Sequence, residues 1–150
     1  MKKILNNIIT VISWIILIFA FIVTVIVFSA DRNNGVPDLF GVVPLTVESD
    51  SMSPVFVKDD MSIDKEIDDV YQLENGDIIT FWTLIDGHRV KNTHRIICVN
   101  DIDGNINFST KGDNNDTVDN YLIEKKDIIA ESKCIIKYIG FPSLWLSEMW

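Results

Sequence analysis

Residues that bind metals or form disulfides are scarce in this sequence. Its 150 residues include only two cysteines and two histidines. Cys98 and Cys134 lack the close spacing of a zinc motif, so we expect no metal site and no cofactor. We expect both to be free thiols that pack as small core residues. A disulfide between them is the alternative outside the cytoplasm.

A surplus of basic side chains is also missing. The chain has 13 Lys and Arg against 22 Asp and Glu. The first thirty residues contain Lys2 and Lys3 and no acid, so the other 120 carry 11 basic and 22 acidic side chains. That part has a net charge of −11 and repels phosphate backbones, which excludes nucleic acid as the expected partner.

Charged side chains are absent from residues 8–30, a run of 23 residues. At a rise of about 1.5 Å per residue, a helix of this length spans the roughly 30 Å hydrocarbon core of a bilayer. A cleaved export signal has a shorter apolar region that ends in a small-x-small site. Here Phe28 stands at position −3 of a cut after Ala30, so we expect a retained anchor. A secreted hydrolase without an anchor is the alternative.

The charges that flank this run predict its orientation. Lys2 and Lys3 precede it, whereas Asp31 and Arg32 follow it. Because cytoplasmic flanks carry the excess of Lys and Arg, we expect a single-pass protein of the cell membrane with its N-terminus in the cytoplasm. The expected parts are a cytoplasmic N-terminus (1–7), an anchor (8–30), a linker (31–40), an extracytoplasmic domain (41–140) and an apolar tail (141–150).

The pattern after residue 40 is typical of β-structure. Apolar and polar residues alternate in short runs, and Asn75-Gly76 and Asp86-Gly87 are strong turn signals. No segment there predicts a helix. We expect a mainly β fold in which the anchor helix precedes an antiparallel sheet or barrel-like domain. The expected strands are 41–47, 61–67, 77–84, 89–99, 106–110 and 127–139.

The tail over residues 141–150 is apolar and aromatic but far too short to cross a bilayer. Trp145 and Trp150 suit a membrane interface. Packing on the domain, or the start of a second span, are the alternatives.

Three polar clusters contain the side chains that an acyl-transfer site needs. Ser49 and Ser51 lie in the first, His94 in a strand-like run, and Asp113 and Asp119 in the third. A serine hydroxyl needs a base to remove its proton, and an imidazole suits that role near neutral pH. The imidazole in turn needs a carboxylate to hold its tautomer. Taken singly, each cluster is more typical of a loop or a structural histidine.

Four runs of residues together resemble the successive motifs of type I signal peptidases, in the family's order and behind an N-terminal anchor. The resemblance covers roughly residues 1–140. It is closest to the branch that includes the endoplasmic-reticulum and archaeal enzymes and some Gram-positive spore-formers, because His94 stands where most bacterial members have lysine. The runs are residues 49–54 (SDSMSP), 76–81 (GDIITF), 93–96 (THRI) and 111–115 (KGDNN).

The resemblance implies a role for each matching residue. It makes Ser51 the nucleophile and His94 the general base. Asp119 is the favoured partner of His94, and Asp113 is a supporting or alternative acid. The oxyanion hole would consist of the backbone N–H of Ser51 and the hydroxyl of Ser49.

Two residues depart from the family pattern or suggest another mechanism. Asp50 replaces the usual glycine and places a carboxylate beside the developing oxyanion unless its side chain points away. Lys91 could suggest a Ser–Lys dyad, but it lies three residues before His94 and out of register with the family's lysine. A calcium loop at residues 113–124 is disfavoured, since Val118 occupies the position that requires glycine.

The expected function is therefore that of a membrane-bound serine endopeptidase which cleaves signal peptides from secretory preproteins through an acyl-enzyme. Its partners would be these preproteins and membrane lipid, and a need for accessory subunits stays open. The alternative is a membrane-tethered, non-catalytic β domain that binds a protein partner, and Asp50 is the residue that favours it.

Overall fold

The computed structural model describes residues 2–85, 87–102 and 104–140. The expectations for the tail over 141–150 lie outside these residues and stay predictions. The chain divides into two compact units with a boundary between Phe40 and Gly41. Each unit is described by itself.

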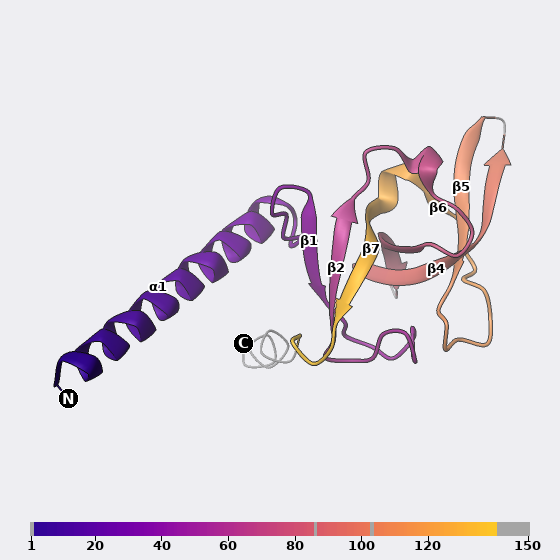
Figure 1. The fold of residues 1–150 in the computed structure, drawn as a ribbon. Coiled ribbons are helices and arrows are strands. Elements are labelled where there is room, and N and C mark those ends of the chain that lie inside the picture. Colours follow the sequence, from indigo (N-terminus) through magenta and orange to yellow (C-terminus); the bar gives the residue numbers. More distant parts are fainter. Residues whose placement is uncertain (1, 86, 103, 141–150) are drawn as a thin grey trace. The chain divides into compact units, whose positions relative to one another are not determined.

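The first unit consists mainly of one helix, α1 (Lys2–Arg32), which is unbroken in Figure 1. It is apolar and long enough to cross a membrane, and none of its residues is buried by the protein. It begins earlier than predicted, because Lys2 and Lys3 already belong to it. Three hydroxyls of the helix, those of Thr10, Ser13 and Thr24, donate to carbonyls four residues earlier. The apolar bilayer tolerates such hydroxyls because their hydrogen bonds stay within the helix.

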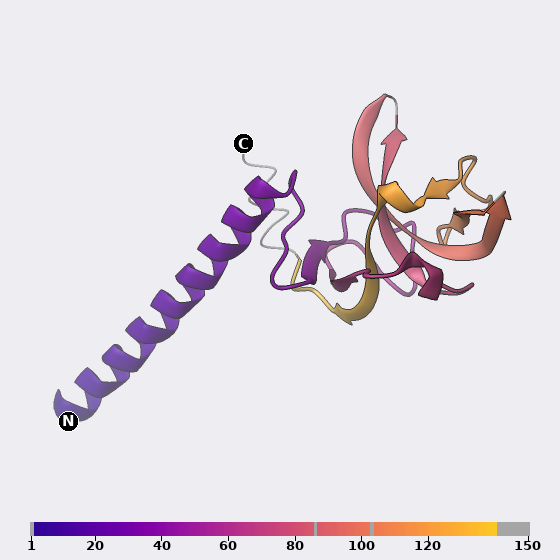
Figure 2. The same ribbon diagram turned by 90° about the horizontal axis from the view of Figure 1, so that it is seen from above.

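The second unit is a seven-stranded antiparallel sheet with the order β1-β2-β7-β3-β4-β5-β6. The predicted mainly β, antiparallel fold is confirmed. Figure 1 shows β7, the last of the described strands, alongside β2, and in Figure 2 β3 and β4 (pink) form a long hairpin. The strands are β1 (Val42–Thr46), β2 (Met61–Glu66), β3 (Ile78–Ile85), β4 (His88–Ile102), β5 (Asn105–Lys111), β6 (Ile123–Glu124) and β7 (Ile128–Ile136).

The structure differs from the prediction in a few elements. β6 was not predicted, because two residues are too short for an alternating pattern. β4 is longer than expected and continues to Ile102. Two short 3-10 helices, η1 (Val70–Gln72) and η2 (Lys125–Asp127), connect strands.

The hydrophobic core lies against β3, β4 and β5. Ile79 and Phe81 of β3, Ile96 of β4 and Phe108 of β5 are all buried in it. In β4 the side chains of residues 92, 94 and 96 share one face, since a strand repeats every two residues. His94 therefore projects from the same face as Ile96 and is itself only 4% exposed.

A buried polar cluster occupies another part of the sheet and centres on Asp64 of β2. Its carboxylate accepts hydrogen bonds from Ser62 and, at 2.6 Å, from Thr80 of β3. Thr80 Oγ1 also lies 2.8 Å from Thr93 Oγ1, and Ser62 Oγ lies 2.8 Å from Ser132 Oγ. Hydroxyl groups alone thus satisfy an acid that is 1% exposed. Burial, the largest effect, raises the pKa of Asp64, although these hydrogen bonds act in the opposite direction.

The prediction that the cysteines are core residues was wrong. Cys98 and Cys134 are free thiols, as expected, but both are exposed. Each stands beside an irregularity in strand pairing: the β4–β5 register shifts between Ile96 and Cys98, and the β2–β7 register shifts next to Cys134. Such bulges change the side-chain alternation that the prediction assumed.

Candidate active site

The two serines lie in a loop over residues 47–60 whose ends are joined. Val47 N donates to the carbonyl of Asp60 at 2.9 Å, and Asp59 N donates to the carbonyl of Val47 at 3.0 Å. The Asp60 carboxylate is fully buried and accepts bonds from Lys137 Nζ at 2.9 Å and Tyr138 N at 3.2 Å. Burial raises the pKa of Asp60, but these bonds outweigh it and hold the pKa below its ordinary value. An ionised Asp60 thus fixes the base of the serine loop to the end of β7.

Ser51 is half-buried, and its backbone is held by the segment after β5. Its carbonyl accepts a hydrogen bond from Asn114 N at 2.9 Å. Asn114 Nδ2 donates to the neighbouring carbonyl of Asp50 at 3.2 Å. Met52, 2% exposed, is buried beneath the loop, and its sulfur accepts a bond from Asp113 N at 3.5 Å. The serine loop is therefore seated on residues 112–114.

Gly112 is required by this close approach. A Cβ at this position would lie 2.6 Å from the carbonyl oxygen of Ser51 and 2.7 Å from Asn115 Nδ2. Both distances are far below van der Waals contact. Only glycine lets the segment pass this close to Ser51.

The Ser51 hydroxyl has Ser49 as its neighbour. Ser49 Oγ donates to Ser51 Oγ at 3.2 Å. Within the described part of the chain, no hydrogen bond joins Ser51 to His94. Both residues instead contact the segment after β5, Ser51 through Asn114 and His94 through Asp119.

His94 is paired with Asp119. The distance from His94 Nδ1 to Asp119 Oδ2 is 2.6 Å, and the two side chains are 5% and 10% exposed. A carboxylate can only accept, so Nδ1 carries the proton and Nε2 is left as the basic nitrogen. Phe81 packs its ring edge-on against His94 with centroids 6.3 Å apart. The ring is thus held in the orientation and tautomer that a general base requires.

Asp113 lies elsewhere and has a different partner. Its two carboxylate oxygens accept from Arg95 Nε at 2.8 Å and Nη2 at 2.6 Å. Arg95 Nη1 also donates to the carbonyl of Gly76 at 2.7 Å. The hydrogen bonds from Arg95 to Asp113 raise the pKa of Arg95. Asp113 therefore anchors the segment after β5 to β4 and is not hydrogen-bonded to His94.

Asp50 and Lys91, the two residues that depart from the family pattern or suggest another mechanism, have partners or positions away from His94. Asp50 Oδ1 accepts a hydrogen bond from Lys58 N at 2.9 Å and so caps the serine loop. Lys91 lies three positions before His94 in the regular β3–β4 pairing, where it stands opposite Trp82. Residues an odd number apart lie on opposite faces of a strand. Lys91 is thus on the other face from His94.

Thr110 is a residue that sequence reasoning did not select. Its hydroxyl donates to Asp119 Oδ2 at 2.7 Å, and its carbonyl accepts from Asp119 N at 2.9 Å. The available signal was position: Thr110 is two residues from Phe108 and therefore shares its inward face in β5. Arg95 and Asn114 also belong to the matched motifs, but no role was predicted for them.

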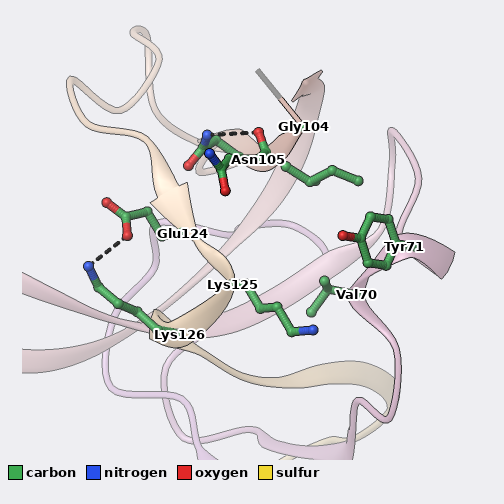
Figure 3. A pocket seen from close by; sticks show the side chains of 9 residues that line it. Val70, Tyr71, Gly104, Asn105, Glu124, Lys125 and Lys126 are labelled. Carbon is green, nitrogen blue, oxygen red and sulfur yellow. Dashed lines mark hydrogen bonds and ion pairs between the residues drawn. The ribbon is translucent and has the colours of Figure 1, made fainter. Parts of the chain in front are cut away.

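A pocket of about 750 Å³ lies at the β5–β6 edge, away from these residues. Figure 3 shows Lys125 extending toward Val70 and Tyr71, while Lys126 pairs with Glu124 at 2.6 Å. Neither serine of the 47–60 loop and neither partner of the His94–Asp119 pair lines it. The predicted catalytic residues thus lie outside this pocket.

Comparisons with known proteins were made against family models and curated sequences. No protein-family model matches the chain. Signal peptidase I W of Bacillus subtilis is 33% identical over 139 residues, which are 93% of this chain and 67% of the relative.

Mammalian proteins match as well. The signal peptidase complex catalytic subunit SEC11C of dog and of human is 30% identical over 112 residues, or 69% of this chain. The chain spans 57% of the length of these subunits. The match to the Bacillus protein covers most of the present chain, including α1 or most of it, and all four motif runs occur in order. The chain therefore belongs to the type I signal peptidase family and is a membrane-anchored hydrolase.

Proposed function

We propose that this chain removes signal peptides from secretory preproteins with Ser51 as nucleophile, His94 as general base and Asp119 as the residue that orients His94. The observation that carries the proposal is the 2.6 Å contact between His94 Nδ1 and Asp119 Oδ2. Asp119 belongs to the same segment that seats the Ser51 loop, and His94 reaches this segment from β4. Family membership supports the reaction class, and the geometry supports the assignment of roles.

In the first step Ser51 Oγ attacks the scissile carbonyl while His94 Nε2 takes its proton. The hydroxyl is hydrogen-bonded to Ser49 in the substrate-free chain. Attack therefore requires Ser51 to turn toward His94 when substrate binds, as is common for catalytic hydrogen bonds that tighten only in the complex. The imidazolium that forms is stabilised by the Asp119 carboxylate.

In the second step His94 gives its proton to the leaving amine, which is the new N-terminus of the mature protein, and the signal peptide stays joined to Ser51 as an ester. The acyl group, which is the signal-peptide carboxyl side, remains on Ser51. A water then loses a proton to His94 and attacks the ester. Ser51 regains its hydrogen, and the signal peptide leaves with a free carboxylate.

The oxyanion of each tetrahedral intermediate needs donors that are already in place. The backbone N–H of Ser51 and the hydroxyl of Ser49 are the proposed donors. Ser49 Oγ is 3.2 Å from Ser51 Oγ and so lies next to the atom that attacks. Asp50, whose carboxylate caps Lys58 N, does not oppose this charge directly.

The substrate would bind as an extended strand with small residues at positions −1 and −3. The proposed location is the cell membrane, with the N-terminus in the cytoplasm, α1 as the single span and the sheet domain outside. Membrane lipid would hold the anchor and the preprotein in the same bilayer.

The proposal is tested with the purified full chain in lipid vesicles and a preprotein embedded in the same vesicles. Wild-type protein should release the mature product. Ser51→Ala and His94→Ala should each lower kcat by about 10³-fold or more. Lys91→Ala is the matched control on the other face of β4 and should keep activity near the wild-type level.

Retained activity in Ser51→Ala, or loss in Lys91→Ala without loss in His94→Ala, would overturn the assignment. A folded wild-type protein that binds the preprotein without cutting it would instead support the non-catalytic alternative. Circular dichroism of each variant shows whether the sheet remains.

A further inference from the structure

Asp119 belongs to a part of the chain that regular structure does not hold. The segment between β5 and β6, residues 112–122, contains turns and bends but no helix or strand. A carboxylate in such a segment can occupy many positions, and fixing it at one of them costs conformational entropy. A base needs its carboxylate at one position, so some neighbour must fix Asp119.

Thr110 is that neighbour by geometry. It lies in β5 and is fully buried, so its backbone and its side chain are both fixed. It contacts Asp119 twice, from its hydroxyl to Oδ2 at 2.7 Å and from Asp119 N to its carbonyl at 2.9 Å. Both bonds connect a strand of the sheet to the irregular segment.

The hydroxyl of Thr110 and the imidazole of His94 share one oxygen. Asp119 Oδ2 is 2.7 Å from Thr110 Oγ1 and 2.6 Å from His94 Nδ1. A second donor on this oxygen draws part of its negative charge away from the imidazole. Asn92 Nδ2 lies 3.4 Å from His94 Nδ1, which is too long to compete with the carboxylate.

We propose that Thr110 is a positioning residue for the Asp119–His94 pair, fixing the carboxylate and limiting how strongly it stabilises the imidazolium. The inference rests on the proposed function of His94 as the base. Thr110 does not touch the substrate; it acts through Asp119. Removing the Thr110 hydroxyl should have two consequences. The Asp119 carboxylate is held less firmly in place, and the charge on its Oδ2 acts more fully on His94.

The test compares Thr110→Val, which keeps the shape and removes the hydroxyl, with Thr110→Ser, which keeps the hydroxyl. The full chain in lipid vesicles is assayed for preprotein cleavage across pH. Thr110→Val should lower kcat about tenfold with little change in KM, and should move the acid limb of the profile upward by about half a pH unit. Thr110→Ser should restore both. Thr117→Val, an exposed threonine of the same segment, is the matched control and should match wild type.

A second readout separates this inference from the proposed function. The chain has only His94 and His88, so the two rings can be followed individually by NMR. In Thr110→Val the His94 ring should titrate at higher pH than in wild type, and His88 should not change. If Thr110→Val does not fold, Thr110→Ala removes the hydroxyl without crowding the site.

The outcomes are distinct. An unchanged His94 titration and unchanged kcat in a folded Thr110→Val protein would overturn the role of Thr110. So would an equal defect in Thr110→Ser, because the defect would then not depend on the presence of the hydroxyl. A wild-type protein that does not cleave, with the His94 titration still shifted by Thr110→Val, would overturn the proposed function alone.

Discussion

The aspartates at positions 113 and 119 are separated by six residues and have different partners. Asp119 contacts His94, whereas Asp113 makes a two-pronged contact with the Arg95 guanidinium. One carboxylate therefore affects the charge and orientation of an imidazole, and the other connects a loop to a strand.

Replacing each aspartate by asparagine separates these roles. Asp119→Asn should lower kcat by about 10³–10⁴-fold, because an amide can donate to Nδ1 and select the wrong tautomer. Asp113→Asn should cost about tenfold or less in kcat and weaken the fold, because one arm of the bidentate bond is lost. Steady-state kinetics and urea unfolding of both variants measure the two effects. The opposite order of activity loss would contradict the assignment.

Asp64 is a residue whose charge costs stability. Because burial raises its folded-state pKa, the folded protein holds the Asp64 proton more tightly than the unfolded chain does. The folded state then binds more protons between the two pKa values, so its free energy of unfolding falls as pH rises through that window. Above the folded-state pKa the buried charge is a constant penalty, offset by its hydroxyl donors.

Asp64→Asn should therefore remove this part of the pH dependence. Urea titrations at a series of pH values from mildly acidic to neutral measure this effect. As the pH rises, the free energy of unfolding should fall more in the wild type than in Asp64→Asn. Thr80→Val, which deletes a donor to the carboxylate, should instead destabilise by about 1–3 kcal/mol at neutral pH. Equal pH slopes in wild type and Asp64→Asn would contradict the expectation.

Single residues were predictable from sequence where chemistry restricts the choice. Few side chains can serve as nucleophile or base, so Ser51 and His94 were chosen from four short motifs, and their roles stay predictions. Thr110 could not, because threonine in a strand is common and its partner Asp119 is brought to it only by the path of an irregular segment. The Asp64 cluster escaped for a similar reason, since its members come from four strands that are distant in sequence.

At the scale of elements, the segment 112–122 and the serine loop 47–60 depend on each other. Their closest approach is at Gly112, where any side chain would meet the carbonyl of Ser51. The backbone at Gly112 cannot move away from Ser51 without loss, because Asn114 N donates a hydrogen bond to the same Ser51 carbonyl. A small displacement of this contact would move Ser51, the proposed nucleophile.

Gly112→Ala should thus reduce kcat by about 10²-fold through a displacement of Ser51. The sheet should persist, since Gly112 lies beyond the end of β5. Far-ultraviolet circular dichroism and preprotein cleavage are the measurements, with Thr117→Ala as the control in the same segment. Full activity in Gly112→Ala would show that the contact is not needed.

β2 was predictable because apolar and polar residues alternate along it, and β3 because the strong turn signal Asn75-Gly76 precedes it. β6 consists of two residues and carries no such pattern. The exposure of the cysteines also escaped prediction, because the register shifts in β4–β5 and β2–β7 arise from pairing between strands and not from local sequence.

At the scale of the whole molecule, the exposed thiols report the orientation of the chain in its membrane. Cys98 and Cys134 are both free and both accessible to solvent. If the sheet domain is outside the cytoplasm, a maleimide that cannot cross membranes should label them in intact cells. The Cys98→Ser/Cys134→Ser double variant should not be labelled. Labelling only after lysis would contradict the proposed orientation.

The strand order has a consequence for biosynthesis. β7 pairs with β2 on one side and with β3 on the other, so among the described strands it alone joins the ladders β1–β2 and β3–β6. Without β7, the pairing leaves a two-stranded piece, β1–β2, and a four-stranded piece, β3–β6, each with an unpaired edge. Asp60, which lies at the base of the serine loop, likewise lacks its hydrogen bond from Lys137 until the residues after β7 are present. We therefore expect the sheet to close, and Asp60 to gain its Lys137 partner, only after β7 has been synthesised.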